Sequence, residues 1–313
     1  MSTDITVQDT PVDSSRGFRG LARRVGRDHW AAAGAIIIVV IVLAAILANV
    51  LSSITGQDPY KYHLSTLSDS GVPLGAFGGI SPTHWFGVEP STGRDLFAIV
   101  VYGARTSLLV SISATVLAVV VGVVVGVTTG FFGGWYDRVM SRFVDVLFGF
   151  PSLVFMISLT AIVPTAFPKT LLLVLVIGFF GWPSIARVVR GQVLSLRERT
   201  FVVASTAMGA GPWHVILRQV VPNVSATIVV FATISIPSMI GVEAALSFLG
   251  VGVPPPTPSW GRTIGNAIQW VQTDPMYLVF PGLALFLVTL AFNVLGDGLR
   301  DALDPRRRQG GQR

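Results

Sequence analysis

The chain lacks cysteine altogether in its 313 residues. This absence excludes a disulfide framework, a thiolate metal site and a cysteine nucleophile. Charged residues are also scarce, at 12% of the chain, whereas soluble domains average about 25%. Hydrophobic residues account for 51%, and the mean hydropathy is +0.69. Because a soluble protein of this length needs a charged surface, the composition indicates an integral membrane protein.

Lysine is almost missing, since Lys61 and Lys169 are the only two. A phosphate-binding loop needs a glycine-rich turn that ends in lysine, and no such turn precedes either residue. The four histidines are His29, His63, His84 and His214. All of them fall outside the apolar runs or at their edges, which excludes an intramembrane serine-histidine pair or a transition-metal site. We therefore expect no catalytic residue, no cofactor and no metal. The basic residues flank apolar runs, which argues against nucleic-acid binding.

Six apolar runs are long enough to cross a bilayer as helices. The hydrocarbon core is about 30 Å thick and needs about 20 residues at 1.5 Å each. Unpaired backbone groups are too costly in lipid for any other single-segment structure. The sequence therefore predicts an all-α membrane protein with spans at Ala31 to Leu51, Ser107 to Thr128, Phe143 to Val163, Leu171 to Val189, Val224 to Leu246 and Tyr277 to Leu295.

The basic residues predict the orientation of these spans. Lysine and arginine are retained on the cytoplasmic side of a membrane. If the N-terminus is inside, all but five of the 22 lysines and arginines lie on that side; the five are Lys61, Arg94, Arg105, Lys169 and Arg262. Six spans then place both termini in the cytoplasm. The protein is expected to be multi-pass in the cytoplasmic membrane.

This topology divides the chain into five parts. A cytoplasmic tail (1–30) precedes the first span (31–51), and an external segment (52–105) follows it. A five-helix core (106–296) leads to a cytoplasmic C-terminal tail (297–313).

The longest cytoplasmic connection, 190–223, has a helical pattern. Its second half carries an apolar stripe at helical spacing, formed by Trp213, Ile216, Leu217, Val220 and Val221. Gly211 and Pro212 suit the start of that helix, and Pro222 suits its end. A shorter stripe in the first half comprises Phe201, Ala204, Ser205 and Met208, with Thr200 as the expected N-cap. Such a helix pair buries its stripe against its own bundle, the bilayer surface or another protein, and the pattern leaves all three open.

The same connection resembles the coupling loop of ABC-importer permeases. The similar residues are Val203-Ala204-Ser205-Thr206-Ala207-Met208-Gly209, followed by Val221-Pro222-Asn223. In the family, a Glu-Ala-Ala stretch and a glycine precede Leu-Pro, so Val203 here stands where glutamate is common. The resemblance implies that this loop contacts an ATPase subunit. The residues it implicates, together with the apolar stripe, are Val203, Ala204, Ser205, Gly209, Trp213, Ile216, Leu217 and Pro222.

Three further stretches are similar to dipeptide and oligopeptide permeases. They are His84 to Arg105 with its Gly93-Arg94-Asp95-Leu96, Leu246 to Gly261 with its Pro255-Pro256-Thr257-Pro258-Ser259-Trp260-Gly261, and Leu295 to Pro305. The resemblance to this peptide/nickel family implies the type I importer bundle and transport of di- or oligopeptides. It also implies a second permease subunit in a heterodimer, cytoplasmic ATP-binding subunits that bind the ATP, and an external substrate-binding protein.

Two acids inside proposed spans, Asp145 and Glu243, are candidates for the transport pathway or its gating. An ionised group within a membrane is costly and usually faces a cavity or a partner. Asp145 lies near Arg142, with which a structural ion pair is expected, and Glu243 could instead bond a neighbouring helix. If both acids carried protons, the chain would be a proton-coupled secondary transporter. Nickel or another small solute is an alternative substrate for an ABC permease.

Overall fold

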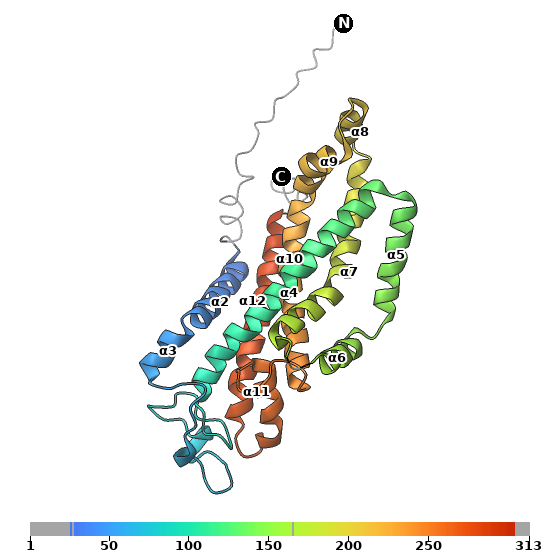
Figure 1. The fold of residues 1–313 in the computed structure, drawn as a ribbon. Helices are drawn as coiled ribbons and strands as arrows, with labels where there is room; N and C mark the ends of the chain where they lie inside the picture. Colours follow the sequence, from blue (N-terminus) through green and yellow to red (C-terminus); the bar gives the residue numbers. More distant parts are fainter. Residues whose placement is uncertain (1–25, 27, 165, 304–313) are drawn as a thin grey trace.

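A computed structural model describes residues 26, 28–164 and 166–303. Most of the predicted N-terminal tail and the last ten residues of the C-terminal tail lie outside this part of the chain. The α-helices, shown in Figure 1, are α2 (His29–Ile46), α3 (Ala48–Thr55), α4 (Leu96–Phe132), α5 (Gly134–Gly149), α6 (Ser152–Ile162), α7 (Lys169–Arg197), α8 (Thr200–Ala207), α9 (Pro212–Val215), α10 (Val221–Phe248), α11 (Trp260–Ala267) and α12 (Met276–Leu303). Short 3₁₀ turns are η2 (Leu64–Thr66), η3 (Ala76–Gly78) and η5 (Ile268–Trp270), and η4 (Ile216–Val220) is a π-helical turn.

Five helical stretches in the described residues are long and apolar enough to cross a membrane: α2, α4, α7, the continuous helix of α9, η4 and α10, and α12. They account for five of the six predicted spans. The helices extend beyond the apolar runs at several ends; α4 has 37 residues, and α12 continues to Leu303 into the predicted C-terminal tail. Helical backbone satisfies its own hydrogen bonds in either solvent, so it need not stop where the hydrocarbon stops.

The predicted third span, Phe143 to Val163, is wrong as a single helix. The chain breaks at Phe150 and Pro151 into α5 and α6, whose axes differ by 84°. The break follows from proline, which disfavours helical geometry in the residue before it; Phe150 is extended, with φ −83° and ψ 141°. Lys169 stabilises the far end of α6, because its Nζ donates to the carbonyl oxygen of Thr160 at 2.8 Å.

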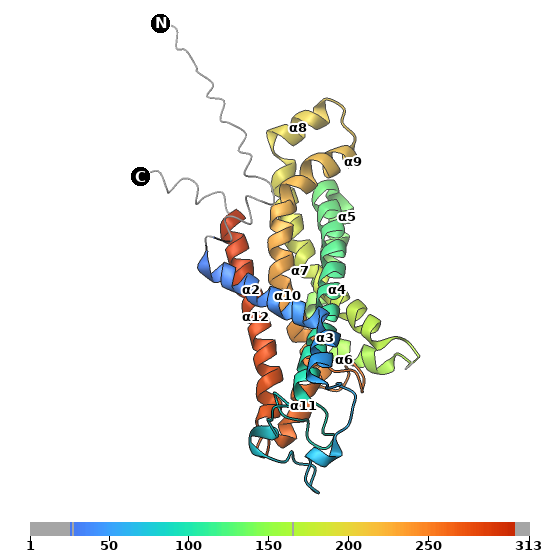
Figure 2. The same ribbon diagram turned by 90° about the vertical axis from the view of Figure 1, so that its left-hand side faces the viewer.

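The centre of the bundle is the packing of α4 against α7 (Figures 1 and 2). Glycine recurs every fourth residue on the contacting face of α4, at Gly122, Gly126 and Gly130. A Cβ at Gly126 would lie 2.7 Å from the carbonyl oxygen of Ala186. The two backbones therefore approach more closely than any side chain on this face would allow.

The segment between α3 and α4 folds over the end of the bundle opposite α8 and lies beside α11 (Figures 1 and 2). Its buried carboxylate Glu89 accepts hydrogen bonds from Arg94 Nε and from the hydroxyl of Tyr277 on α12, both at 2.6 Å. Arg94 also donates to the carbonyl oxygen of Pro256, at 3.2 Å. This network ties the predicted external segment 52–105 to the proline-containing loop before α11.

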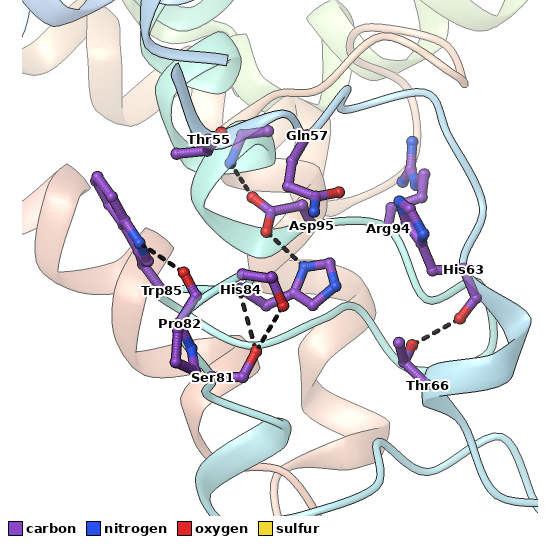
Figure 3. A network of polar contacts seen from close by, with 12 residues as sticks. Thr55, Gln57, His63, Thr66, Ser81, Pro82, His84, Trp85, Arg94 and Asp95 are labelled. Carbon is purple, nitrogen blue, oxygen red and sulfur yellow. Dashed lines mark hydrogen bonds and ion pairs between the residues drawn. The ribbon is translucent and has the colours of Figure 1, made fainter. Parts of the chain in front are cut away.

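A second buried pair begins α4, as Figure 3 shows. Asp95 caps the helix by accepting from the backbone N–H of Ala98 at 2.7 Å, and its other oxygen lies 2.8 Å from Nδ1 of His84. The ring of His63 packs edge-on against His84, with centroids 5.4 Å apart. Burial, and then the neighbouring His84, lower the pKa of His63.

Candidate coupling loop and intramembrane acids

The predicted connection 190–223 is largely helical, as its pattern indicated. Helix α7 continues to Arg197, and a new helix starts at Pro212, so α8 is flanked by only a few irregular residues on each side. Gly211 and Pro212 do begin this helix, as predicted. Thr200 is not the N-cap of α8; Arg199 occupies that position without a side-chain hydrogen bond.

The prediction that Pro222 ends the second helix is wrong. The helix passes through Pro222 and continues as α10, directly after the π-helical turn η4. Proline lacks the N–H that an α-helix interior requires, but here it lies in the first turn after the wider π turn. Such turns are inserted into otherwise regular helices.

The same π turn divides the predicted apolar stripe of the second half between two environments. Ile216 and Val220 are buried, at 2% and 0% exposure, whereas Trp213 and Leu217 are exposed, at 59% and 63%. A pattern calculated for 3.6 residues per turn loses its phase where the turn is wider. Of the five residues in the predicted stripe, two therefore pack inside, two lie on the surface, and Val221 is partly buried.

The stripe of the first half divides in a similar way. Ser205 is buried, together with Val202, which the pattern missed. The Ser205 hydroxyl accepts a hydrogen bond from Nε2 of Gln219 at 2.7 Å, and this bond joins α8 to η4. Phe201 and Met208 are exposed, at 45% and 82%. One face of α8 is thus fastened to the chain's own bundle while the other remains apolar and open.

Figure 1 shows α8 and α9 projecting beyond the ends of α4 and α5, and their exposed apolar side chains form an apolar tip at this end of the bundle. We define the apolar tip as Phe201, Val203, Met208, Trp213 and Leu217, all more than a third exposed. Gly209, within it, has φ +89°. This left-handed conformation turns the chain from α8 towards α9 and disfavours residues with a side chain. The remaining predicted residue, Ala204, is also exposed.

Asp145 does not pair with Arg142. Its Oδ1 accepts from Nη2 of Arg187 on α7 at 2.8 Å, with both side chains 55% exposed. A second bond of this kind, which the sequence did not suggest, joins Asp137 to Arg190 through two contacts, at 2.5 and 2.7 Å. The predicted span began only at Phe143, within α5, so the sequence did not show how α5 packs against α7. The ion pairs hold α5 to α7 beside a cavity of about 280 Å³.

Glu243 lies in α10 at 0% exposure. Ser247, one turn later, donates to its Oε1 at 2.8 Å, while Oε2 makes no hydrogen bond in the described part of the chain. The hydroxyl of Ser107 on α4 is also buried and lies beside the carboxyl group of Glu243. In this conformation Glu243 therefore faces neighbouring helices and not an open passage; its role in transport stays a prediction.

The chain is similar to known transport proteins over most of its length. Residues 118–309 match the family described as the inner membrane component of binding-protein-dependent transport systems. A glutathione transport system permease protein, GsiD, of Escherichia coli O157:H7 is 38% identical over 284 residues, covering 91% of this chain and 89% of the relative. The corresponding protein of Shigella flexneri serotype 5b is 40% identical over the same shares.

A solved structure agrees with the fold. A chain of the MetNI methionine ABC transporter, in an inward-facing conformation, matches with a TM-score of 0.50 and 23% identity, over 67% of this chain and 98% of the matched chain. The predicted all-α ABC-permease bundle is confirmed, and the reading as a proton-coupled secondary transporter is not supported. The chain belongs to the inner-membrane permeases of binding-protein-dependent ABC importers.

Proposed function

We propose that this chain is one permease half of an importer that moves di- or oligopeptides across the cytoplasmic membrane. The observation that carries the substrate class is the 38% identity, over 91% of the chain, to permeases named for the peptide glutathione. Nickel, the other substrate class that the resemblance raised, has no comparable support. Substrate choice in such importers rests largely with the external binding protein, so the class is proposed and not the individual peptide.

Uptake tests this proposal directly. Cells that carry the complete importer are expected to accumulate labelled glutathione or dipeptide, and deletion of this subunit alone is expected to reduce uptake to the background of cells without the importer. Labelled nickel is measured in the same cells. If nickel uptake depends on this subunit and uptake of glutathione and dipeptide does not, the peptide proposal is contradicted, while membership of the ABC permease family is unaffected.

We also propose that the apolar tip docks on an ATPase subunit and so couples ATP hydrolysis to transport. ATP hydrolysis is assigned to cytoplasmic partner subunits, since the sequence offers no phosphate-binding loop. Exposed aromatic and aliphatic side chains on a short helix match a helix-in-groove contact, in which a few buried anchors supply most of the binding energy.

The proposed importer has two further partners. A second permease subunit completes the passage, and an external binding protein delivers the substrate at the α11 end.

Orientation is open to a separate test. The arginine distribution predicts that both termini and the apolar tip are cytoplasmic. The chain has no native cysteine, so single cysteines can report on each side. Ser70→Cys, in the predicted external segment, is expected to react with a membrane-impermeant thiol reagent in intact cells. Trp135→Cys, at a 73% exposed position in the first turn of α5, should react only after the cells are opened. The reverse pattern would invert the topology.

A further inference from the structure

Arg105, on α4, is a cation that interacts electrostatically with the phenol of Tyr60, which is not an acid that could pair with it. Its side chain is exposed, and among residues 26, 28–164 and 166–303 it makes no hydrogen bond or ion pair. It lies two residues before the predicted start of the span at Ser107. A charged head at this level is costly unless it reaches the polar boundary or finds an anion.

A groove between α2 and α4 begins beside this arginine; Figures 1 and 2 show the two helices passing each other obliquely. Its volume is about 320 Å³, and apart from Arg105 and Ser113 its lining is apolar: Val42, Ala45, Ile46, Leu108, Leu109 and Ile112. Ile46 and Leu109 are 66% and 53% exposed. From Arg105 to Ser113 the groove follows α4 for about 12 Å, at 1.5 Å per residue.

Tyrosines mark the outer end of the groove. The hydroxyl of Tyr102, about one turn before Arg105, donates to Oδ1 of Asn49 on α3 at 2.8 Å. The ring of Tyr60 packs edge-on against Tyr102, with centroids 6.3 Å apart. Tyrosine is enriched at the level of lipid headgroups. The cation therefore lies at the headgroup boundary, and the apolar groove extends from it into the hydrocarbon.

We propose that this groove holds a phospholipid from the leaflet at the α3 end of the bundle. The phosphate accepts hydrogen bonds from the Arg105 guanidinium, and one acyl chain lies along Leu109 and Ile112. Charge complementarity selects an anionic headgroup, because arginine is the only ionisable side chain in the lining.

Native mass spectrometry of the purified importer complex, titrated with phosphatidylglycerol, tests the site. Arg105→Gln is expected to weaken retention of one lipid about fivefold, the effect of removing one charge at an anionic headgroup. Arg105→Lys keeps the charge and should retain most of the binding. Ile112→Trp fills the groove and should weaken binding without changing charge. Arg138→Gln, which removes an exposed cation from α5 at the opposite end of the bundle, is the matched control and should not change retention of this lipid.

Three outcomes would overturn the proposal. The first is equal retention of phosphatidylglycerol by wild type, Arg105→Gln and Ile112→Trp. The second is full competition by inorganic phosphate, which would mean a simple anion site with no role for the acyl chain. The third is efficient cross-linking of Leu109→Cys to the second permease subunit, because the groove would then be a protein interface.

Discussion

Replacing Gly209 with aspartate is expected to abolish substrate uptake while the protein remains in the membrane. A Cβ at this position would meet no atom within 4 Å, so the cost is conformational. Left-handed backbone costs a residue with a side chain about 1–2 kcal/mol, and aspartate adds a charge to the apolar tip that we expect to dock on the ATPase subunit. Membrane abundance, copurified ATPase subunit and uptake are measured in the same cells; uptake and copurification should fall, and abundance should not.

Gly211→Asp is the matched control. It puts the same charge two residues further along the same loop, where Gly211 has φ −65° and a Cβ would again meet nothing within 4 Å. Its effect on coupling is therefore expected to be much smaller. Trp213→Ala tests the apolar contact itself, because truncation of a central aromatic anchor typically costs about 2 kcal/mol or more.

Two results would contradict the coupling hypothesis. Normal uptake with both Gly209→Asp and Trp213→Ala would show that the apolar tip is not needed. Loss of membrane abundance with Trp213→Ala would instead assign this residue to the chain's own packing, where its ring already contacts Phe132 edge-on at 5.9 Å.

Glu243→Leu is expected to cause a large loss of folded protein, and Glu243→Gln almost none. The buried carboxyl group accepts a hydrogen bond from Ser247, and glutamine keeps an acceptor oxygen in the same place. Leucine has no acceptor, so the buried Ser247 hydroxyl would lose the acceptor for its proton, at a cost of about 1–3 kcal/mol. Abundance in the membrane and the thermal midpoint of the purified complex measure this difference.

Measuring both membrane abundance and substrate uptake for each variant separates a structural role of Glu243 from a role in transport. Asp145→Asn, at an exposed ion pair, is the control acid; its loss should change stability by less than about 1 kcal/mol. If Glu243→Gln leaves abundance normal but eliminates uptake, a titrating carboxyl participates in transport, and the purely structural interpretation is wrong.

The spans and the family were accessible from the sequence because each depends on local information. About 20 apolar residues in succession have few alternatives to a membrane helix, which is why α2, α4, α7, α10 and α12 were all expected. The start of α9 at Gly211 and Pro212 was correct for a similar reason, since both residues restrict the backbone directly.

Tertiary contacts decided the rest. The sequence suggested Arg142 for Asp145 because the two are close along the chain, but α5 and α7 bring Arg187 to 2.8 Å. Periodicity identified the apolar residues of the connection between α7 and α10 but not which of them are buried. The π turn η4 shifts the helical repeat, and a hydrogen bond from Gln219 holds α8 at Ser205. By itself, therefore, the sequence determined which segments enter the membrane and which family the chain resembles. Only the packed structure decided which side chains remain exposed for a partner or a lipid, because exposure depends on neighbours that are distant in the chain.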